Sequence, residues 1–191
     1  MRNVGTESQR TYQNKLDSGF FDKYMSGVGL DIGYAGYVEG SLAILDTATG
    51  IDLGYPGYDG VNLPFTSESQ DYVYSSHCLE HILHYKDSLY EWFRVLKIGG
   101  CLIITVPHQY LYEKKLNLPS VWNEGHLRFY TPSSLLKEIE ESLQPNSYRV
   151  RLLEDGDFQF NYNVIPPAHS EGQYEITLVI QRIKTPEWEM K

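Results

Sequence analysis

The sequence predicts an α/β protein with a doubly wound, mostly parallel sheet and an antiparallel edge strand pair at its C-terminal end. Strand-like and helix-like segments alternate through most of the chain. The run Cys101–Val106 (CLIITV) is continuously apolar, which is typical of a strand buried on both faces of a parallel sheet. Near the C-terminus, Tyr148–Leu153 and Tyr174–Ile183 are strand-like with no helix pattern between them, so we expect them to pair antiparallel.

The first half of the chain contributes three further strands. Val28–Ile32 is a short apolar run that ends at a glycine, and it predicts the first strand. Ala48–Leu53 predicts the second strand, and Ser41–Thr47 a short helix before it. Gly54–Asn62 holds three glycines and a proline, which predicts a loop or a very short strand. Asp71–Ser76 (DYVYSS) is rich in strand-forming residues and predicts the next strand.

Two helices carry clear signals. Ser88–Leu96 has apolar residues at positions 89, 92, 93 and 96, a helical period, and we expect Gly99-Gly100 to end this helix. Thr131 and Pro132 are typical of an N-cap and a first helical position. They predict a helix over Ser133–Leu143 that stops before the next proline.

The chain of 191 residues is expected to form one domain, over residues 1–191, that buries about 70% of its unfolded surface. Residues 1–26 are a polar lead-in with one amphipathic stretch, Leu16–Met25, and residues 157–172 form a long loop between the last two strands. The net charge is −9, and Lys114-Lys115 is the only adjacent basic pair. Because phosphate binding needs a basic face, we expect neither nucleic acid nor an anionic membrane as a partner.

Cysteine usage and hydropathy favour a cytoplasmic protein. Cys78 and Cys101 lie in apolar segments, which indicates reduced core residues. The N-terminus has no apolar signal core, and no apolar run approaches the ~18 residues of a membrane span. The sequence leaves a homodimer open.

A glycine-containing turn follows the first strand. In Gly29–Gly36 (GLDIGYAG), Gly33 and Gly36 allow a ligand to approach the backbone, and Asp31 can accept hydrogen bonds from it. Roughly 20 residues later Asp52 ends the second strand, where a carboxylate can bind both hydroxyls of a ribose. A tight structural turn with solvated aspartates uses the same residues, so the motif alone leaves both interpretations open.

The turn favours a nucleoside without a pyrophosphate. It does not read GxGxxG, and the helix expected after Gly36 is short and poorly patterned. A dinucleotide places its pyrophosphate on a helix N-terminus, so a nicotinamide oxidoreductase is the less favoured interpretation.

Six stretches occur in order between residue 29 and about residue 136: GLDIGYAG, IDL, NLPF, DYVYSSHCLEHI, WFRVLKIGGCLIITVP and GHLRFYTPSSL. Together they resemble the class I S-adenosylmethionine-dependent methyltransferases, of the Methyltransf_11/23-type branch. The resemblance implies a Rossmann-like fold, S-adenosylmethionine as cofactor and S-adenosylhomocysteine as product. We expect no metal.

The resemblance also implies a set of cofactor-binding residues. They are Asp31, Gly33, Tyr34 and Gly36 for the methionine moiety, Asp52 and Leu53 for the ribose and the flank of the adenine, Asn62, Leu63 and Phe65 for the adenine ring, and Ser76 and His77 for the sulfonium end. The family usually has GxGxG in the turn. Here Ala35 is a mild change, whereas Tyr37 either swings outward or narrows the pocket.

His77, Glu80 and His81 also fit H-x-x-E-H, the inverted zinc-protease signature. That chemistry needs both histidines on one face of a helix and a third ligand elsewhere. His77 directly follows a β-rich run, so we expect it at a strand exit, and zinc hydrolysis is disfavoured.

Transfer of a methyl group to a hydroxyl gains from a base that removes the proton. The candidates are His77, His108, His126 and Glu124. His126 lies in WNEGHLRFY, a segment that helps to cover the acceptor in related enzymes, and we prefer it as base or acceptor ligand. A structural histidine that holds this loop in place is an equal alternative.

The acceptor is expected to be a small molecule, with a hydroxyl of a sugar or related metabolite, such as those of surface polysaccharides, as the preferred class. Arg128 can pair with an acceptor phosphate or carboxylate, or with a nearby carboxylate of the protein. Tyr110, Tyr112, Trp122 and Tyr130 can stack on a sugar ring, although we expect core packing for at least two of them. N-methylation stays open, as does a non-catalytic nucleoside-binding or partner-binding module that retains the methyltransferase fold.

Overall fold

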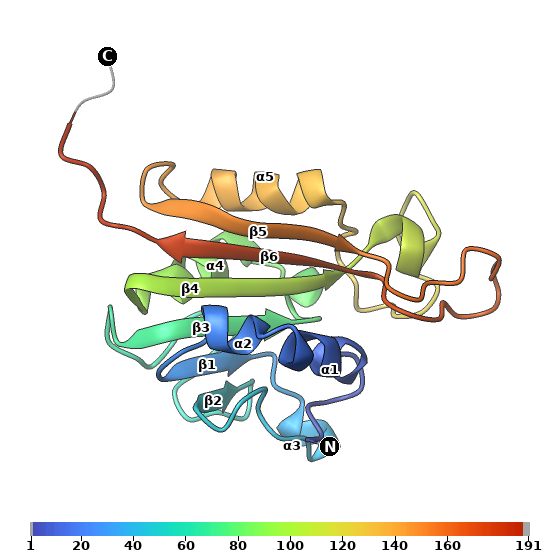
Figure 1. Ribbon diagram of the computed structural model, residues 1–191, viewed down its shortest axis with the longest axis horizontal. Helices are drawn as coiled ribbons and strands as arrows, with labels where there is room; N and C mark the ends of the chain where they lie inside the picture. Colours follow the sequence, from blue (N-terminus) through green and yellow to red (C-terminus); the bar gives the residue numbers. More distant parts are fainter. Residues whose placement is uncertain (1, 189–191) are drawn as a thin grey trace.

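A computed structural model describes residues 2–188 of the protein. Its six strands form one sheet in the order β2-β1-β3-β4-β6-β5 (Figure 1). The strands are β1 (Gly29–Ile32), β2 (Ala48–Ile51), β3 (Gln70–Ser76), β4 (Leu96–Pro107), β5 (Tyr148–Gly156) and β6 (Glu175–Arg182). The first four are parallel to one another, and β6 runs antiparallel to both β4 and β5. The predicted fold class, including the antiparallel pair at the end of the chain, is confirmed.

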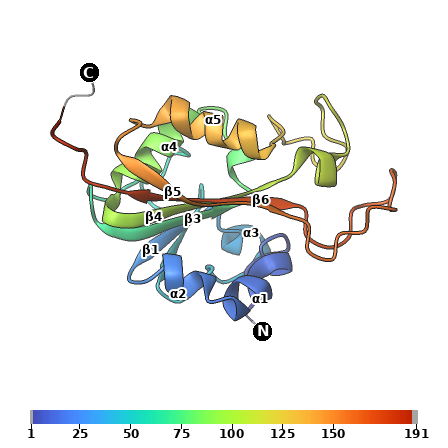
Figure 2. The same cartoon turned by 45° about the horizontal axis from the view of Figure 1, so that its top comes forward.

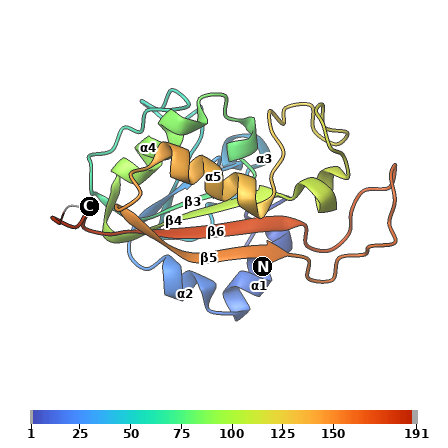
Figure 3. The same cartoon turned by 90° about the horizontal axis from the view of Figure 1, so that it is seen from above.

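Helices cover both faces of the sheet. They are α1 (Gln9–Asp17), α2 (Phe20–Tyr24), α3 (Gly36–Glu39), α4 (Tyr85–Arg94) and α5 (Pro132–Ser142), with the short turns η1 (Leu79–His81) and η2 (Gln109–Glu113). The helices α4 and α5 lie on one face of the sheet, and α1 and α2 lie on the other (Figure 2). Seen from above, α4 and α5 lie side by side over the sheet (Figure 3).

Alternation along the central strands separates two apolar cores. In β3, Tyr72 and Tyr74 pack with α1 and α2, whereas Val73 packs with α4 and α5. In β4, Ile103 joins the first of these cores and Leu102 the second. Successive side chains of a strand point to opposite faces, so a strand that is apolar at every position is buried on both sides. The interpretation of CLIITV as such a strand is confirmed.

The segment before β2 differs from its prediction, because Ser41–Thr47 is not helical. The short helix is α3, which ends at Gly40 with the left-handed φ of +66° that favours glycine. The backbone amide of Leu42 donates to the carbonyl of Asn3 at 2.7 Å, and that of Ile44 donates to the carboxylate of Asp31, also at 2.7 Å. These amides therefore bond to distant parts of the chain instead of forming a helix.

Gly99 and Gly100 also differ from their prediction, because α4 already ends at Arg94 and both glycines lie inside β4. The strand bulges here, and its register against β3 is irregular. Gly99 has a φ of +92°, and a Cβ on Gly100 would lie 2.8 Å from the carbonyl oxygen of Asp71. The glycines are required by a bulge and a close backbone approach rather than by a helix end.

The polar lead-in is part of the fold. The expected amphipathic stretch Leu16–Met25 is divided between α1 and α2 by Gly19, whose φ is +70°. Phe20 and Phe21 of α2 are buried against the sheet. Within the described residues, no helix combines the length and the apolar character that crossing a membrane requires.

The substitution Leu102→Ala tests the burial of β4 on the face that packs with α4 and α5. Leu102 is fully buried, so we expect its truncation to lower the free energy of unfolding by about 2–5 kcal/mol. Ile98 of the same strand is 54% exposed and provides the control, Ile98→Ala, with an expected change below about 0.5 kcal/mol. Urea unfolding followed by circular dichroism measures both, and equal losses would contradict this assignment.

Candidate functional site

The carboxyl ends of β1, β2 and β3 meet at one edge of the sheet. Ile32 pairs with Ile51 on one side and with Ser75 on the other, so the residues that follow these strands lie side by side. Two cavities open along this edge, and Gly33 lines both of them. Ligands of open α/β sheets bind in this position, outside the carboxyl ends of the strands.

The larger cavity has a volume of about 320 Å³. Its walls combine carboxylate, aromatic and aliphatic side chains. The lining residues are Gly33, Asp52, Leu53, Tyr58, Asp59, Gly60, Val61, Cys78, His81, Ile82, Leu83 and His84. A carboxylate at the end of β2 among apolar side chains fits a ribose diol joined to a flat, mostly apolar ring. Asp52 and Leu53 both line this cavity, and their roles toward the ribose and the adenine stay predictions.

The smaller cavity, of about 120 Å³, lies on the other side of Gly33. Its polar walls suit a charged amino-acid moiety. The residues that line it are Val4, Gly5, Thr6, Glu7, Ser8, Asp31, Gly33, Tyr34, Ala35, Ser76 and His77. The structure thus brings Asp31, Gly33 and Tyr34 together with Ser76 and His77 in one cavity, which Gly36 does not line. Their roles toward the methionine moiety and the sulfonium end stay predictions.

Residues 4–8 were not anticipated as part of the site. The backbone contact between Asn3 and Leu42 holds this segment, and Glu7 accepts a hydrogen bond from the Tyr174 hydroxyl at 2.8 Å. The sequence gives no local signal for this role, because the segment is a short polar stretch whose partners lie far along the chain.

The glycines of the turn have structural reasons as well. Gly33 has a φ of +81°, and a Cβ there would lie 2.4 Å from the Cβ of Cys78. A Cβ on Gly36 would collide with the ring of Tyr34. Tyr37 is 52% exposed and packs edge-on against Tyr34, with 5.6 Å between ring centroids. Tyr37 lines neither cavity, so of the two expected alternatives the structure shows the outward orientation.

Asp31 is buried at the base of the smaller cavity. Burial raises the pKa of its carboxyl group to about 7, although the hydrogen bond from the Ile44 amide and the charge of Arg2 act in the opposite direction. The side chain is thus partly protonated near neutral pH, and a ligand ammonium group in this cavity would favour its ionised form.

The three residues expected around the adenine ring lie outside the larger cavity. Leu63 is buried in the core on the α4 side, and Phe65 stacks on Tyr55 with 5.8 Å between ring centroids. The Asn62 amide donates to the Asp59 carboxylate at 2.7 Å. Tyr58 and residues 59–61 form the wall of the larger cavity on the side where the adenine ring is expected. Asn62, Leu63 and Phe65 therefore support the loop that carries the wall.

Beyond β3, the H-x-x-E-H motif begins at a strand exit, as expected. His77 follows the last residue of β3 with a φ of +51°, and its Nε2 lies 3.0 Å from Glu175 Oε1. Burial alone would lower the pKa of His77, but the hydrogen bond and negative charge of Glu175, together with Glu80, raise it above its ordinary value.

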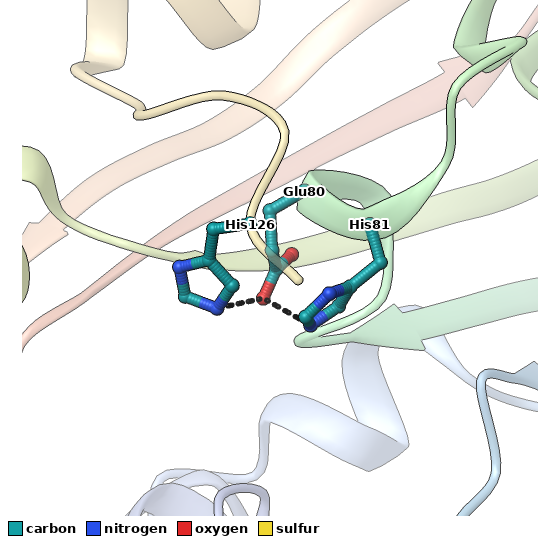
Figure 4. A group of neighbouring side chains, drawn as sticks. All are labelled: Glu80, His81 and His126. Carbon is teal, nitrogen blue, oxygen red and sulfur yellow. Dashed lines mark ion pairs between the residues drawn. The ribbon is translucent and has the colours of Figure 1, made fainter. Parts of the chain in front are cut away.

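Glu80, His81 and His126 form a cluster beside the larger cavity (Figure 4). The oxygen Oε1 of Glu80 lies 3.9 Å from Nε2 of His81 and 3.9 Å from Nε2 of His126. His126 reaches the cluster from the loop between η2 and α5, and its Nδ1 is hydrogen-bonded to Glu113. Sequence reasoning missed Glu113, because nothing in its local pattern indicates a contact with His126.

His108 is tied to the backbone. Its Nδ1 accepts hydrogen bonds from the amides of Tyr110 at 2.9 Å and Leu111 at 3.3 Å, which cap η2. Its Nε2 lies 3.4 Å from Asp155, and burial lowers the pKa of the ring. Both ring nitrogens thus have structural contacts, and His108 lines neither cavity. These contacts favour a capping role over that of a general base.

Arg128 takes the second of its two expected roles, pairing within the protein. Its guanidinium donates to the Leu79 carbonyl at 2.8 Å, lies over the ring of Tyr85 and is 3.5 Å from Glu138. Tyr130 is buried, and its hydroxyl donates to Glu138 at 2.8 Å.

The other aromatic candidates differ in exposure. Tyr112 is buried, and the indole nitrogen of Trp122 donates to its carbonyl at 3.0 Å. Tyr110 is 56% exposed and packs beside His108. Of the four aromatic residues, Tyr112 and Tyr130 are therefore packing residues, in agreement with the expectation for at least two of them.

Comparisons with known proteins agree with this geometry. Residues 30–104 match the Methyltransf_11 family, a methyltransferase domain. The fold is similar to that of a SAM-dependent methyltransferase from Aquifex aeolicus, with a TM-score of 0.58, 14% identity and coverage of 94% of this chain and 95% of the other. A SAM-dependent methyltransferase from Methanosarcina mazei is also similar, with a TM-score of 0.57, 14% identity and coverage of 86% of this chain and 97% of the other. For one from Archaeoglobus fulgidus the TM-score is 0.56 and the identity 14%, with coverage of 92% of this chain and 97% of the other. Among curated proteins, none matches the sequence.

The pH dependence of stability tests the burial of Asp31. Its pKa is about 7 in the folded protein and 3.8 ordinarily, so between these values the folded state binds more protons than the unfolded state. The free energy of unfolding therefore falls as the pH rises from about 4 to about 7, by at most about 1.4 kcal/mol per unit from this group.

The variant Asp31→Asn keeps an oxygen for the Ile44 amide but does not titrate. We expect the free energy of unfolding of the wild-type protein, relative to that of Asp31→Asn, to fall as the pH rises from about 4 to about 7 and to stay constant above pH 7. Chemical denaturation at a series of pH values measures the difference, and parallel curves for the two proteins would refute the buried-carboxyl interpretation.

Proposed function

We propose that this chain, whose residues 30–104 match a methyltransferase domain and whose fold is similar to that of SAM-dependent methyltransferases, transfers a methyl group to a hydroxyl of a small molecule. The observation that supports this best is the pair of cavities that meet at Gly33. One has Asp52 at the end of β2, and the other has Asp31 at its base.

The residues of the two cavities fit the parts of S-adenosylmethionine, which supplies an activated methyl group on a sulfonium. Asp52 would accept hydrogen bonds from the ribose hydroxyls, and Leu53 and Val61 would flank the adenine. Asp31 would pair with the ammonium group of the methionine moiety. Because Gly33 lies between the two cavities, the sulfonium end would lie close to it, near Ser76 and His77.

The cluster beside the larger cavity favours an oxygen acceptor. A neutral amine needs little help to accept a methyl group, whereas a hydroxyl gains from a group that removes its proton. The Nδ1 of His126 is held by Glu113, which leaves Nε2 to act on an acceptor, an arrangement in which a carboxylate orients a basic imidazole. His81 belongs both to this cluster and to the wall of the cavity.

We infer a sugar or a related metabolite as the acceptor, with surface polysaccharides as one setting. The net charge of −9 disfavours a phosphate-rich polymer as substrate. Tyr110, in η2 after β4, is an exposed ring of the kind that stacks on a sugar.

Binding of S-adenosylhomocysteine tests the cofactor assignment. At 100 times its dissociation constant a ligand adds about 2.7 kcal/mol to the stability, so we expect the melting temperature to rise by about 5–10 °C. Asp52→Ala should remove most of this shift, because it removes the ribose-binding carboxylate. The matched control is Asp22→Ala, an exposed aspartate on α2 outside both cavities, which should keep the shift.

Differential scanning fluorimetry measures these shifts, and an unchanged wild-type melting temperature at millimolar ligand would contradict the assignment. Release of S-adenosylhomocysteine from S-adenosylmethionine with a panel of sugar acceptors then tests turnover. A thermal shift without turnover across such a panel would favour a nucleoside-binding module without catalysis.

A further inference from the structure

Glu80 is a fully buried carboxylate next in the chain to His81, which lines the larger cavity. Within the part of the chain that the structure describes, neither of its carboxylate oxygens has a hydrogen-bond partner. Burial of an ionised group is strongly unfavourable unless an opposite charge or several donors compensate it. A buried carboxylate without a hydrogen-bond partner in a native fold needs an explanation, and a bound ion is one.

The two histidines of the cluster are oriented by groups that accept hydrogen bonds. Nδ1 of His81 lies 2.9 Å from the carbonyl oxygen of Gly125, which can only accept, so this nitrogen carries the proton. Nδ1 of His126 is bonded in the same way to the carboxylate of Glu113, which Ser120 holds through a 2.6 Å hydrogen bond. In the neutral rings, the lone pairs are thereby on Nε2 of both histidines.

These two lone pairs and the carboxylate of Glu80 converge on the same space (Figure 4). The three ligand atoms lie within 4.8 Å of one another, and the separations of 3.9 Å from Glu80 to each ring are too long for hydrogen bonds. Three electron-pair donors without a proton between them repel one another unless a cation lies among them.

We propose that Glu80, His81 and His126 bind a divalent transition-metal ion, with Zn²⁺ as the best-matched candidate. Two imidazoles and one carboxylate form the ligand set of zinc sites that keep a coordination position open for substrate. Zinc bonds of about 2.0–2.2 Å place tetrahedral ligands about 3.3–3.5 Å apart. The 3.9 Å separations from Glu80 to each ring need to shorten by roughly half an ångström, and the widest separation in the cluster, up to 4.8 Å, by about 1.4 Å. The expectation of no metal is replaced by this proposal.

The surroundings of the cluster match those of a metal site. Histidine ligands commonly donate their second N–H to a carboxylate or a backbone carbonyl, and Glu113 and Gly125 provide one of each. Nε2 of His77, the first residue of the H-x-x-E-H motif, bonds Glu175 instead, and its Nδ1 lies 3.8 Å from Oε1 of Glu80. The motif thus supplies Glu80 and His81 as ligands, and the other histidine comes from a distant loop, unlike the arrangement of an inverted zinc protease.

The use of the ion rests on the proposed function. His81 belongs to the cluster and also lines the cavity assigned to the nucleoside. An acceptor hydroxyl beside His81 would therefore be close to both the cluster and the cavity. With Nε2 of His126 on the ion, this nitrogen would no longer remove the proton of the acceptor itself. The ion would instead bind the hydroxyl oxygen and lower its pKa, and the proton would pass to water. An oxygen electron pair then forms the bond to the methyl carbon while the carbon–sulfur bond breaks. Its electron pair stays on sulfur, which yields S-adenosylhomocysteine and a methyl ether.

Metal binding is measured on the full chain without any cofactor. After dialysis against a chelator, titration with Zn²⁺ should show one tight site per chain by calorimetry and elemental analysis. Added Co²⁺ should give the visible absorption of a low-symmetry site. Glu80→Gln and His126→Ala should each abolish the tight site, and Glu113→Gln should weaken it about 10–100-fold. His84→Ala, an exposed histidine close by in the chain, should leave it intact.

Far-UV circular dichroism shows whether each variant is folded, and this measurement does not depend on the cavity that His81 and His84 line. If Glu80→Gln or His126→Ala does not fold, His81→Asn, at a half-buried position, is measured in its place. Absence of a tight site in the wild-type protein, or a site that survives Glu80→Gln and His81→Asn, would overturn the proposal. If the wild-type protein binds the metal but S-adenosylhomocysteine does not shift its melting temperature, the proposed function is wrong and the proposed metal site is retained.

Discussion

The parallel pairing of β1 with β2 and β3 is the constraint on which the rest of the structure depends. Because these strands are in register and end together, the chain leaves the sheet at three adjacent points, at Gly33, Asp52 and His77. No single loop forms the site, and its two cavities lie on either side of the first of these points. The apolar layers above and below the sheet keep that edge fixed, which is what a preorganised binding site requires.

The elements with local signals were predictable, and those that depend on distant partners were not. Thr131 caps α5 as expected, with a capping box to Ser134, because this motif lies within four residues. The segment Ser41–Thr47 was predicted wrongly, because its amides bond Asn3 and Asp31 far away in the sequence. The same reason explains why the cavity wall formed by residues 4–8 was missed.

The candidate site divides in the same way, into residues that a local pattern predicts and residues whose positions depend on distant partners. The placement of Asp31, Gly33 and Asp52 follows from strand ends, which a hydropathy pattern reveals. The position of the adenine-side wall depends on how a loop rich in glycine folds, and there Leu63 proved to be a core residue. The H-x-x-E-H signature requires a helix with two histidine ligands, and the position of His77 after a β-rich run argued against one. The structure joins Glu80 and His81 to His126, a pairing that no spacing rule predicts.

The edges of the sheet limit how copies of this chain can associate. At one edge, β2 has only four residues, and at the other β5 exposes most of its side chains, among them Arg149, Arg151 and Glu154. Short strands and charged edges resist the addition of a strand from another molecule. Edge-to-edge aggregation is thereby discouraged, and a homodimer of this protein would have to form through its helices or loops rather than by continuing the sheet.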